Sequence, residues 1–123
     1  MKTCILISDD DVDILDVCKI ILEQQNYRVE TRTRCENIIE DISLAKPDII
    51  LMDLWIPEIG GESAVNLMKN NEATQHVPVI LFSANAEIAD IANRTNANAY
   101  LSKPFDVIAL KKIIEENMGM YAQ

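Results

Sequence analysis

Short runs of apolar residues recur along the chain, and segments with helical periodicity lie between them. Three continuous runs are rich in Ile, Leu and Val and cover Cys4–Ile7, Ile49–Met52 and Val77–Phe82. Weaker runs of the same kind lie at Tyr27–Thr31 and Ala99–Ser102. A run without alternating polar positions is typical of a strand that is buried on both faces, as in a parallel sheet covered by helices. The pattern therefore predicts five strands.

Between the predicted strands, apolar residues recur three or four positions apart, while Glu, Lys, Asn and Gln fill many of the positions between them. This spacing predicts helices that pack one face on a sheet and expose the other. The periodic segments run over Val12–Leu22, Cys35–Ile42, Ala64–Met68, Ile88–Ala92 and Val107–Ile114. Five strands that alternate with five helices predict right-handed crossovers, and hence a five-stranded parallel α/β sheet with helices on both faces.

Size and composition narrow the possible functions. With 123 residues the chain can form one core, so we expect a single domain over residues 1–123, with any output domain on another chain. The net charge of −9, from 11 basic and 20 acidic residues, argues against direct binding to nucleic acid. No stretch approaches the roughly 20 apolar residues of a membrane span, so we expect a soluble cytoplasmic protein with no membrane partner. Cys4, Cys18 and Cys35 fall on apolar faces, which predicts buried, reduced thiols.

Residues able to perform chemistry stand directly after the predicted strands. They are Ser8, Asp9 and Asp10 after the first strand, Asp53 after the third, Ser83 after the fourth and Lys103 after the fifth. Ligands of open parallel sheets bind outside the carboxyl ends of the strands, so we expect these groups to meet at one edge. Each has a plainer explanation when taken singly: Asp10 or Asp11 could cap a helix, Ser83 could cap the next one, and Lys103 could be a solvated loop residue.

Three carboxylates at one edge require a cation. Two carboxylates about 5 Å apart repel each other by roughly 3 kcal/mol at an effective dielectric constant of 20. A few hard oxygen ligands favour Mg²⁺, and no His or Cys is placed to select zinc. With a hydroxyl and a lysine beside them, such carboxylates are equipped for phosphoryl transfer, in which Asp53 would attack a phosphoryl group and form an acyl phosphate.

Four ordered motifs resemble the receiver domains of two-component response regulators, the CheY-like superfamily, over nearly the whole chain. The motifs are Asp9-Asp10, Asp53 followed by Leu54-Trp55-Ile56-Pro57 and Gly60-Gly61, Ser83-Ala84, and Tyr100-Leu101-Ser102-Lys103-Pro104-Phe105. The resemblance implies a flavodoxin-like (βα)5 doubly wound fold. It also implies a signalling domain that is activated by phosphorylation in a two-component system or phosphorelay, and that is not a turnover enzyme.

The same resemblance assigns roles at the site. Asp53 would be the phosphoacceptor, and Lys103 would pair with the phosphoryl group. Asp10 and Asp53 would bind Mg²⁺ directly together with the backbone carbonyl of Trp55, while Asp9 would act mainly through water. The family also commonly has a cis peptide bond before the proline that follows the lysine, here the bond between Lys103 and Pro104.

Partners and switching follow from the resemblance as well. A histidine kinase or a histidine phosphotransfer domain would donate the phosphoryl group. Ser83 would be the switch hydroxyl and Tyr100 the switch aromatic, so that a downstream protein target reads a surface formed by the fourth helix, the fifth strand and the fifth helix. The domain would be a monomer or weak dimer. In this family the position of Trp55 borders the path of the hydrolytic water, and the indole is bulky there. Asn85 has no charge with which to orient that water. We therefore expect slow self-dephosphorylation.

Three other functions compete with this interpretation. A phosphatase of the haloacid dehalogenase type also uses a strand-end aspartate and Mg²⁺, but it needs a second acid two residues later, where this chain has Trp55. A nucleotide- or flavin-binding module would need a glycine-rich phosphate loop, and the chain has three glycines, Gly60, Gly61 and Gly119. An inactive receiver-like scaffold is disfavoured because every acidic and basic position of the expected site is filled.

Overall fold

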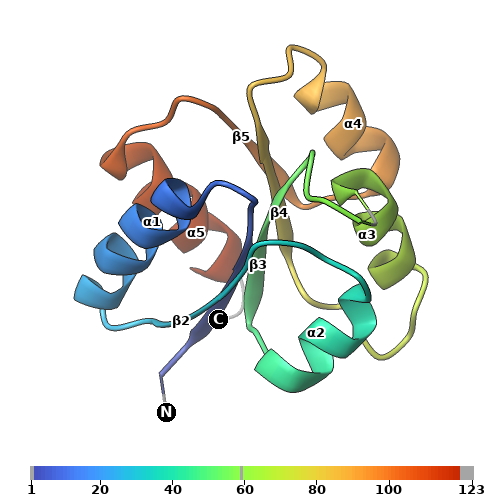
Figure 1. Cartoon of the computed structure of the whole chain (residues 1–123), viewed down its shortest axis with the longest axis horizontal. Coiled ribbons are helices and arrows are strands. Elements are labelled where there is room, and N and C mark those ends of the chain that lie inside the picture. The colour runs from blue at the N-terminus through green and yellow to red at the C-terminus, as the bar shows by residue number, and fades with distance from the viewer. Residues whose placement is uncertain (1, 59, 120–123) are drawn as a thin grey trace.

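The computed structural model describes residues 2–58 and 60–119, which form one parallel sheet flanked by helices (Figure 1). The strands are β1 (Cys4–Ser8), β2 (Arg28–Arg32), β3 (Ile49–Asp53), β4 (Val79–Ser83) and β5 (Ala99–Ser102). The helices are α1 (Val12–Gln24), α2 (Ile38–Ala45), α3 (Gly61–Lys69), α4 (Ile88–Thr95) and α5 (Val107–Gly119). The strand order is β2-β1-β3-β4-β5, with every neighbouring pair parallel. This arrangement confirms the predicted doubly wound, flavodoxin-like α/β fold.

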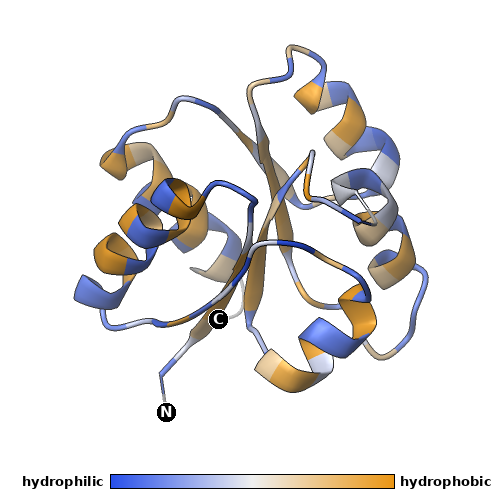
Figure 2. Cartoon of the chain, in the orientation of Figure 1, coloured by the Kyte–Doolittle hydropathy of each residue, from blue (hydrophilic) through white to orange (hydrophobic). Residues whose placement is uncertain are grey.

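Two apolar cores lie on opposite faces of the sheet. One joins the sheet to α1 and α5, and the other joins it to α2, α3 and α4, as the two groups of helices in Figure 1 show. Strands β1, β3 and β4 are buried along their whole length, and the middle of the sheet is correspondingly hydrophobic in Figure 2. In β3, Leu51 belongs to the first core and Met52 to the second. Because side chains alternate along a strand, the next residue, Asp53, points to the side of α1 and α5.

Most element boundaries differ from the prediction by a few residues, and two of these differences have a clear local cause. The fourth strand begins at Val79, two residues after the start of the apolar run at Val77. The N–H of Val77 instead donates to the carbonyl of Thr74 within a turn, and Pro78 has no N–H to offer to a ladder. Helix α2 begins at Ile38 and not at Cys35, because the side chain of Asn37 caps it by accepting from the N–H of Glu40.

Strand β2 forms one edge of the sheet and carries alternating charges. The side chains of Arg28, Glu30 and Arg32 share one face of this strand because they are two residues apart. Arg28 Nη1 lies 3.1 Å from Glu30 Oε2, and Arg32 Nη1 lies 3.7 Å from Glu30 Oε1. Arg28 also donates to the carbonyl of Ala45 at the end of α2, at 2.9 Å. A row of paired charges therefore covers this edge.

Cys4, Cys18 and Cys35 are buried free thiols, as the pattern of apolar faces predicted. Among residues 2–58 and 60–119, no helix is both long enough and apolar enough to cross a membrane.

Candidate functional site

Three carboxylates gather at the carboxyl ends of β1 and β3. Because these two strands are neighbours in register, with Ser8 opposite Met52, the residues that follow them meet at one edge. One oxygen from each of Asp9, Asp10 and Asp53 lies within 4.8 Å of the others. Asp9 and Asp53 are buried, and Asp10 is exposed. The structure thus brings together the three acidic residues that the sequence singled out.

Lys103 supplies the positive charge of this cluster. Its ammonium donates to Asp9 Oδ2 at 2.8 Å and to Asp53 Oδ1 at 3.3 Å. The backbone N–H of Lys103 donates to the carbonyl of Ser83 at 2.9 Å, which fixes the loop after β5 against the end of β4. The peptide bond between Lys103 and Pro104 is cis, as the resemblance implied.

An aromatic ring lies beneath the ammonium. Lys103 Nζ is 4.7 Å from the centroid of the Phe82 ring, a distance at which a cation is attracted to the ring face. Phe105 packs edge-on against Phe82, with ring centroids 6.1 Å apart. Nothing in the sequence indicated this contact, because Phe82 stands inside an apolar run that predicts an ordinary core residue.

Burial and the neighbouring charges both shift the pKa values of the ionisable groups in the cluster. Burial is the largest influence on Asp53 and raises the pKa of its carboxyl group, and the charge of Asp9 raises it further against the opposing effect of Lys103. Burial by itself would lower the pKa of Lys103, but the hydrogen bond to Asp9 and the charge of Asp53 outweigh it and raise that pKa. The lysine is therefore held in its charged form.

The donor set suits a small, hard cation. Asp9 uses both oxygens within the protein, since Oδ1 accepts from the N–H of Asp11 at 2.8 Å and Oδ2 accepts from Lys103. Asp10 is exposed. Of the two carboxylate oxygens of Asp53, Oδ1 accepts a hydrogen bond from Lys103, and within residues 2–58 and 60–119 Oδ2 accepts none. Asp10 and Asp53 thus retain oxygens that no protein donor in the described part of the chain uses, whereas both oxygens of Asp9 are already engaged. Oxygen ligands of this kind fit Mg²⁺.

The N-terminus of α1 is fixed by the next acidic residue. Asp11 accepts from the N–H groups of Asp13 and Ile14, so it is Asp11 and not Asp10 that caps the helix. The sequence allowed either residue in this role. Because Asp11 takes the cap, Asp10 remains available to the cluster.

Within the part of the chain that the structure describes, Ser83 and Tyr100 make no hydrogen bond to the carboxylates. Ser83 is buried, and its Oγ accepts from the N–H of Asn85 at 3.0 Å. Tyr100 lies opposite Leu81 in the β4–β5 ladder, and the residue is 45% exposed. The alternation of side chains places both residues on the side of the sheet that α4 covers. Trp55 lies in the turn after β3, and the residue is 69% exposed.

Gly61 approaches the phosphoacceptor candidate more closely than any larger residue could. A Cβ at this position would lie 2.4 Å from the carbonyl oxygen of Asp53 and 2.7 Å from Leu54 Cα. The N–H of Gly61 donates to the carbonyl of Leu54 at 2.9 Å. The start of α3 therefore rests directly on the backbone that carries Asp53, a contact that the sequence indicated only as a pair of glycines.

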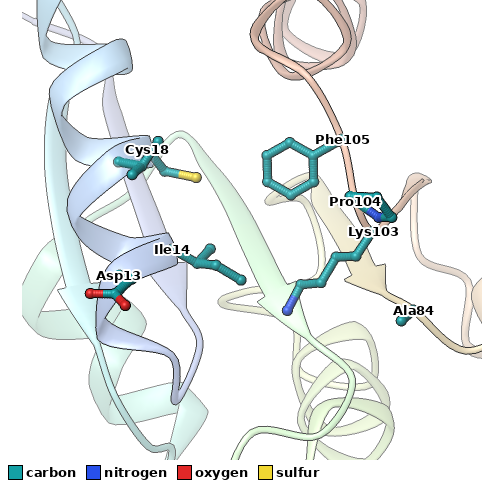
Figure 3. Close-up of a pocket in the computed structure, with 8 residues that line it drawn as sticks. Asp13, Ile14, Cys18, Ala84, Lys103, Pro104 and Phe105 are labelled. Carbon is teal, nitrogen blue, oxygen red and sulfur yellow. The ribbon is translucent and has the colours of Figure 1, made fainter.

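A groove of about 490 Å³ opens beside Lys103 (Figure 3). Ile14 and Cys18 of α1 form one wall, and Lys103 and Phe105 from the loop after β5 form the other, as the labelled side chains in Figure 3 show. Val17 of α1, which is 55% exposed, completes the rim. The groove is mainly apolar and leads to the edge of the sheet where the carboxylates lie.

Comparisons with known proteins agree with this geometry. A family model for the response regulator receiver domain matches residues 5–115. The DNA-binding dual master transcriptional regulator RpaA of Synechocystis sp. is 35% identical over 84% of this chain and 44% of its own length. The polar-differentiation response regulator DivK of Brucella anthropi is 29% identical over 96% of this chain and 97% of its own length. The chain thus spans less than half of RpaA but nearly all of DivK.

Solved structures share the whole fold. The receiver domain of the sensor histidine kinase PA1611 from Pseudomonas aeruginosa PAO1 is 26% identical, with a TM-score of 0.87 and coverage of 97% of this chain and 99% of that one. That structure has a magnesium ion coordinated in its active-site cleft. A CheY-like receiver domain protein from Methanospirillum hungatei is 25% identical, with a TM-score of 0.87 over 98% of this chain and 96% of that one. The chain belongs to the response regulator receiver domains of two-component signal transduction.

Proposed function

We propose that this domain accepts a phosphoryl group on Asp53 from a phosphohistidine donor and uses the modification to change a protein-binding surface. The observation that carries this proposal is the cluster of Asp9, Asp10, Asp53 and Lys103 at one edge of the sheet. A carboxylate oxygen of Asp53 attacks phosphorus, the P–N bond to the donor imidazole breaks, and an acyl phosphate forms. The imidazole leaves with the electron pair of that bond and takes up a proton.

Each residue of the cluster has a distinct task in the proposed reaction. Lys103 keeps its positive charge and moves from Asp53 to an oxygen of the phosphoryl group. Asp10, Asp53 and the carbonyl of Trp55 would hold Mg²⁺, with Asp9 acting through water. When bound, Mg²⁺ would neutralise the negative charge that the carboxylates and the phosphoryl oxygens bring together. Ser83 would donate its hydroxyl hydrogen to the new group.

The competing functions have less support. Trp55 stands where a haloacid dehalogenase-type phosphatase needs its second acid, and it cannot exchange a proton with a leaving group. A nucleotide- or flavin-binding function has no glycine-rich phosphate loop to support it. Buried ion pairs seldom add net stability, so stability alone does not account for two buried carboxylates beside a lysine. A scaffold that is never phosphorylated would give this charged cluster no function.

The groove between α1 and the loop after β5 supports a direction of approach for the donor. An imidazole that reaches Asp53 past Lys103 would bring neighbouring apolar side chains over Ile14 and Phe105. We therefore propose that the segment around the donor histidine, on a histidine kinase or a phosphotransfer domain, packs in this groove. A Val17→Glu variant should then slow transfer from a phosphorylated protein donor while reacting normally with a small acyl phosphate.

The output is proposed to lie on the other side of the sheet. Tyr100 is 45% exposed while the hydroxyl of Ser83 accepts from the N–H of Asn85, and we assign this arrangement to the unphosphorylated domain. Movement of Ser83 toward the phosphoryl group would free space for Tyr100 to turn inward and would change the surface of α4, β5 and α5. A downstream protein would read this surface, with the domain a monomer or weak dimer that does not bind nucleic acid.

Mass spectrometry after incubation with a small acyl phosphate and Mg²⁺ tests the central proposal. We expect a mass gain of one phosphoryl group that is absent in Asp53→Ala and retained in Asp16→Ala, which removes an exposed carboxylate from α1. No gain in the unaltered protein would favour the scaffold. Continuous release of phosphate over many turnovers would favour the phosphatase.

The lifetime of the acyl phosphate tests the proposed roles of Trp55 and Asn85. We expect slow self-dephosphorylation, because the exposed indole of Trp55 stands two residues from Asp53 and Asn85 has no charge with which to orient a water. Replacing Trp55 with Asn should shorten the half-life. A half-life that is longer in Trp55→Asn than in the unaltered protein would contradict this assignment.

A further inference from the structure

Helix α4 is held at its N-terminus by a short chain of hydrogen bonds that starts at Ser83. The hydroxyl oxygen of Ser83 accepts from the N–H of Asn85 at 3.0 Å, and Oδ1 of Asn85 accepts from the N–H of Glu87 at 2.7 Å. Glu87 directly precedes the helix and has no side-chain cap hydrogen bond of its own. The position of the Ser83 hydroxyl is therefore coupled to the turn from which α4 starts.

An ion pair holds the other end of α4. Arg94, in the last turn, donates from Nε to Glu62 Oε2 at 3.0 Å and from Nη2 to Glu62 Oε1 at 2.9 Å. Two parallel hydrogen bonds fix both planar groups, which makes this pair more specific than a single contact. Glu62 follows Gly61, whose backbone rests on Asp53 and Leu54. The pair thus connects α4 to the backbone of the phosphoacceptor by a route that does not pass through Ser83.

A surface groove separates the β3–α3 loop from α4. It has a volume of about 400 Å³ and is lined by Trp55 and Glu62 on one side and by Asn85, Ile91 and Arg94 on the other. Beneath the groove, the buried face of α4 packs in the apolar core that also contains α3. The ion pair therefore joins the two helices at their surface, beside this groove.

Arg94 has a second acidic neighbour on its own helix. Asp90 lies four residues earlier, and an acid that precedes a base by four positions is the favourable orientation for pairing along a helix. The hydrogen bond to Glu62 is the largest influence that raises the pKa of Arg94, and the charges of Glu87 and Asp90 raise it further. If α4 moves away from α3, Arg94 can exchange Glu62 for Asp90, so the guanidinium has a partner in either position.

We propose that the Glu62–Arg94 pair is a latch that holds α4 in its unphosphorylated position, and that Asp90 competes with Glu62 for the arginine. This inference rests on the proposed function, because a phosphoryl group on Asp53 is what would draw Ser83 away from Asn85. The latch sets how far α4 is displaced when that happens. Weakening it moves the unphosphorylated domain toward the phosphorylated arrangement, and Asp90 limits this effect by offering Arg94 a second carboxylate.

Amide hydrogen exchange of α4 in the intact chain tests the latch. In the unphosphorylated protein, Glu62→Gln should raise the exchange rate of α4 amides by about two- to fivefold, the range expected for losing an exposed ion pair. In an Asp90→Asn background the same Glu62→Gln change should raise the rate by a larger factor, because Arg94 then has no second carboxylate to bind. In that background a charge swap, Glu62→Arg with Arg94→Glu, should bring the rate back toward that of Asp90→Asn alone.

The experiment separates failure of the latch from failure of the proposed function. Exchange in the unphosphorylated protein requires no phosphoryl transfer, and mass spectrometry of the same samples reports phosphorylation of Asp53 independently. A rate that Glu62→Gln leaves unchanged, or an increase that is no larger in the Asp90→Asn background, would overturn the latch even if Asp53 is phosphorylated. The expected increases in a protein that never gains a phosphoryl group would support the latch as a structural device and refute the signalling function.

Discussion

Lys103 Nζ lies 2.8 Å from Asp9 Oδ2, and this contact joins two residues that are 94 positions apart in the chain. The side chain of Asp9 is fully buried, whereas that of Lys103 is 19% exposed. A buried carboxylate without a partner is strongly destabilising, so the lysine has a structural role before any phosphoryl group arrives.

Replacing Lys103 with Met should therefore destabilise the domain. The variant keeps most of the apolar stem but leaves Asp9 and Asp53 without their cation, so we expect the free energy of unfolding to fall by about 3 kcal/mol in the presence of a chelator. Urea denaturation measures this change. Added Mg²⁺ should restore part of the lost stability, because it binds the folded site.

The matched control for that substitution is Lys112→Met, which alters an exposed lysine of α5. Its unfolding free energy should change by less than about 0.5 kcal/mol. Equal stability of Lys103→Met and the unaltered protein would contradict the view that the lysine compensates for the buried carboxylates.

Substitution of Gly61 by Ala should also destabilise the folded domain, although a change from Gly to Ala stabilises most helices. The new Cβ would lie 2.4 Å from the carbonyl oxygen of Asp53, and backbone atoms cannot rotate out of the way. We expect a loss of about 3 kcal/mol in unfolding free energy, together with weaker Mg²⁺ binding. Ser63→Ala, at an exposed position of the same helix, should leave both unchanged. A Gly61→Ala protein that is more stable than the original would show that the start of α3 is free to shift.

Trp55 should report metal binding by fluorescence. It is the single tryptophan of the chain, it is 69% exposed, and it stands two residues after Asp53. Titration with MgCl₂ should change its emission intensity in a saturable way, and NaCl at equal ionic strength should not. Asp53→Asn should abolish the saturable change. A Mg²⁺ response that survives in that variant would locate the metal elsewhere.

Cys35 should make the protein less stable at alkaline pH. Burial, together with Asp41, raises the pKa of its thiol from 9.0 to about 12. Above pH 9 the unfolded chain loses this proton while the folded chain keeps it, so unfolding becomes more favourable as pH rises, whereas below pH 9 the thiol contributes no pH dependence.

The comparison with Cys35→Ala isolates this effect in urea denaturation. We compare the unfolding free energy of the unaltered protein with that of Cys35→Ala. The value for the unaltered protein minus the value for the variant should fall by about 1 kcal/mol between pH 9 and pH 10. A difference that stays constant over this range would mean that the thiol is not held neutral by the fold.

The fold and the acidic cluster could be predicted from the sequence because both follow from simple geometry. Continuous apolar runs mark strands that are buried on both faces, and parallel strands bring Asp9, Asp53 and Lys103 to one edge wherever their ends align. Neither inference needs the details of packing.

The remaining features depend on contacts that leave no periodic signal. Phe82 lies under the lysine only because of the register between β4 and β5. Glu62 and Arg94 are 32 positions apart on two polar helix faces, where any charge is tolerated. The exposed orientation of Tyr100 is a choice between rotamers, and its residue type does not determine it.

The charged edge at β2 also bears on how the domain behaves at high concentration. An exposed edge strand offers unpaired N–H and carbonyl groups to any extended chain nearby, and strand addition of this kind starts fibrils. Arg28, Glu30 and Arg32 oppose it, because a second chain that pairs there would have to strip water from a row of ions. The sheet can therefore remain open at this edge while its helices are free to recruit partners.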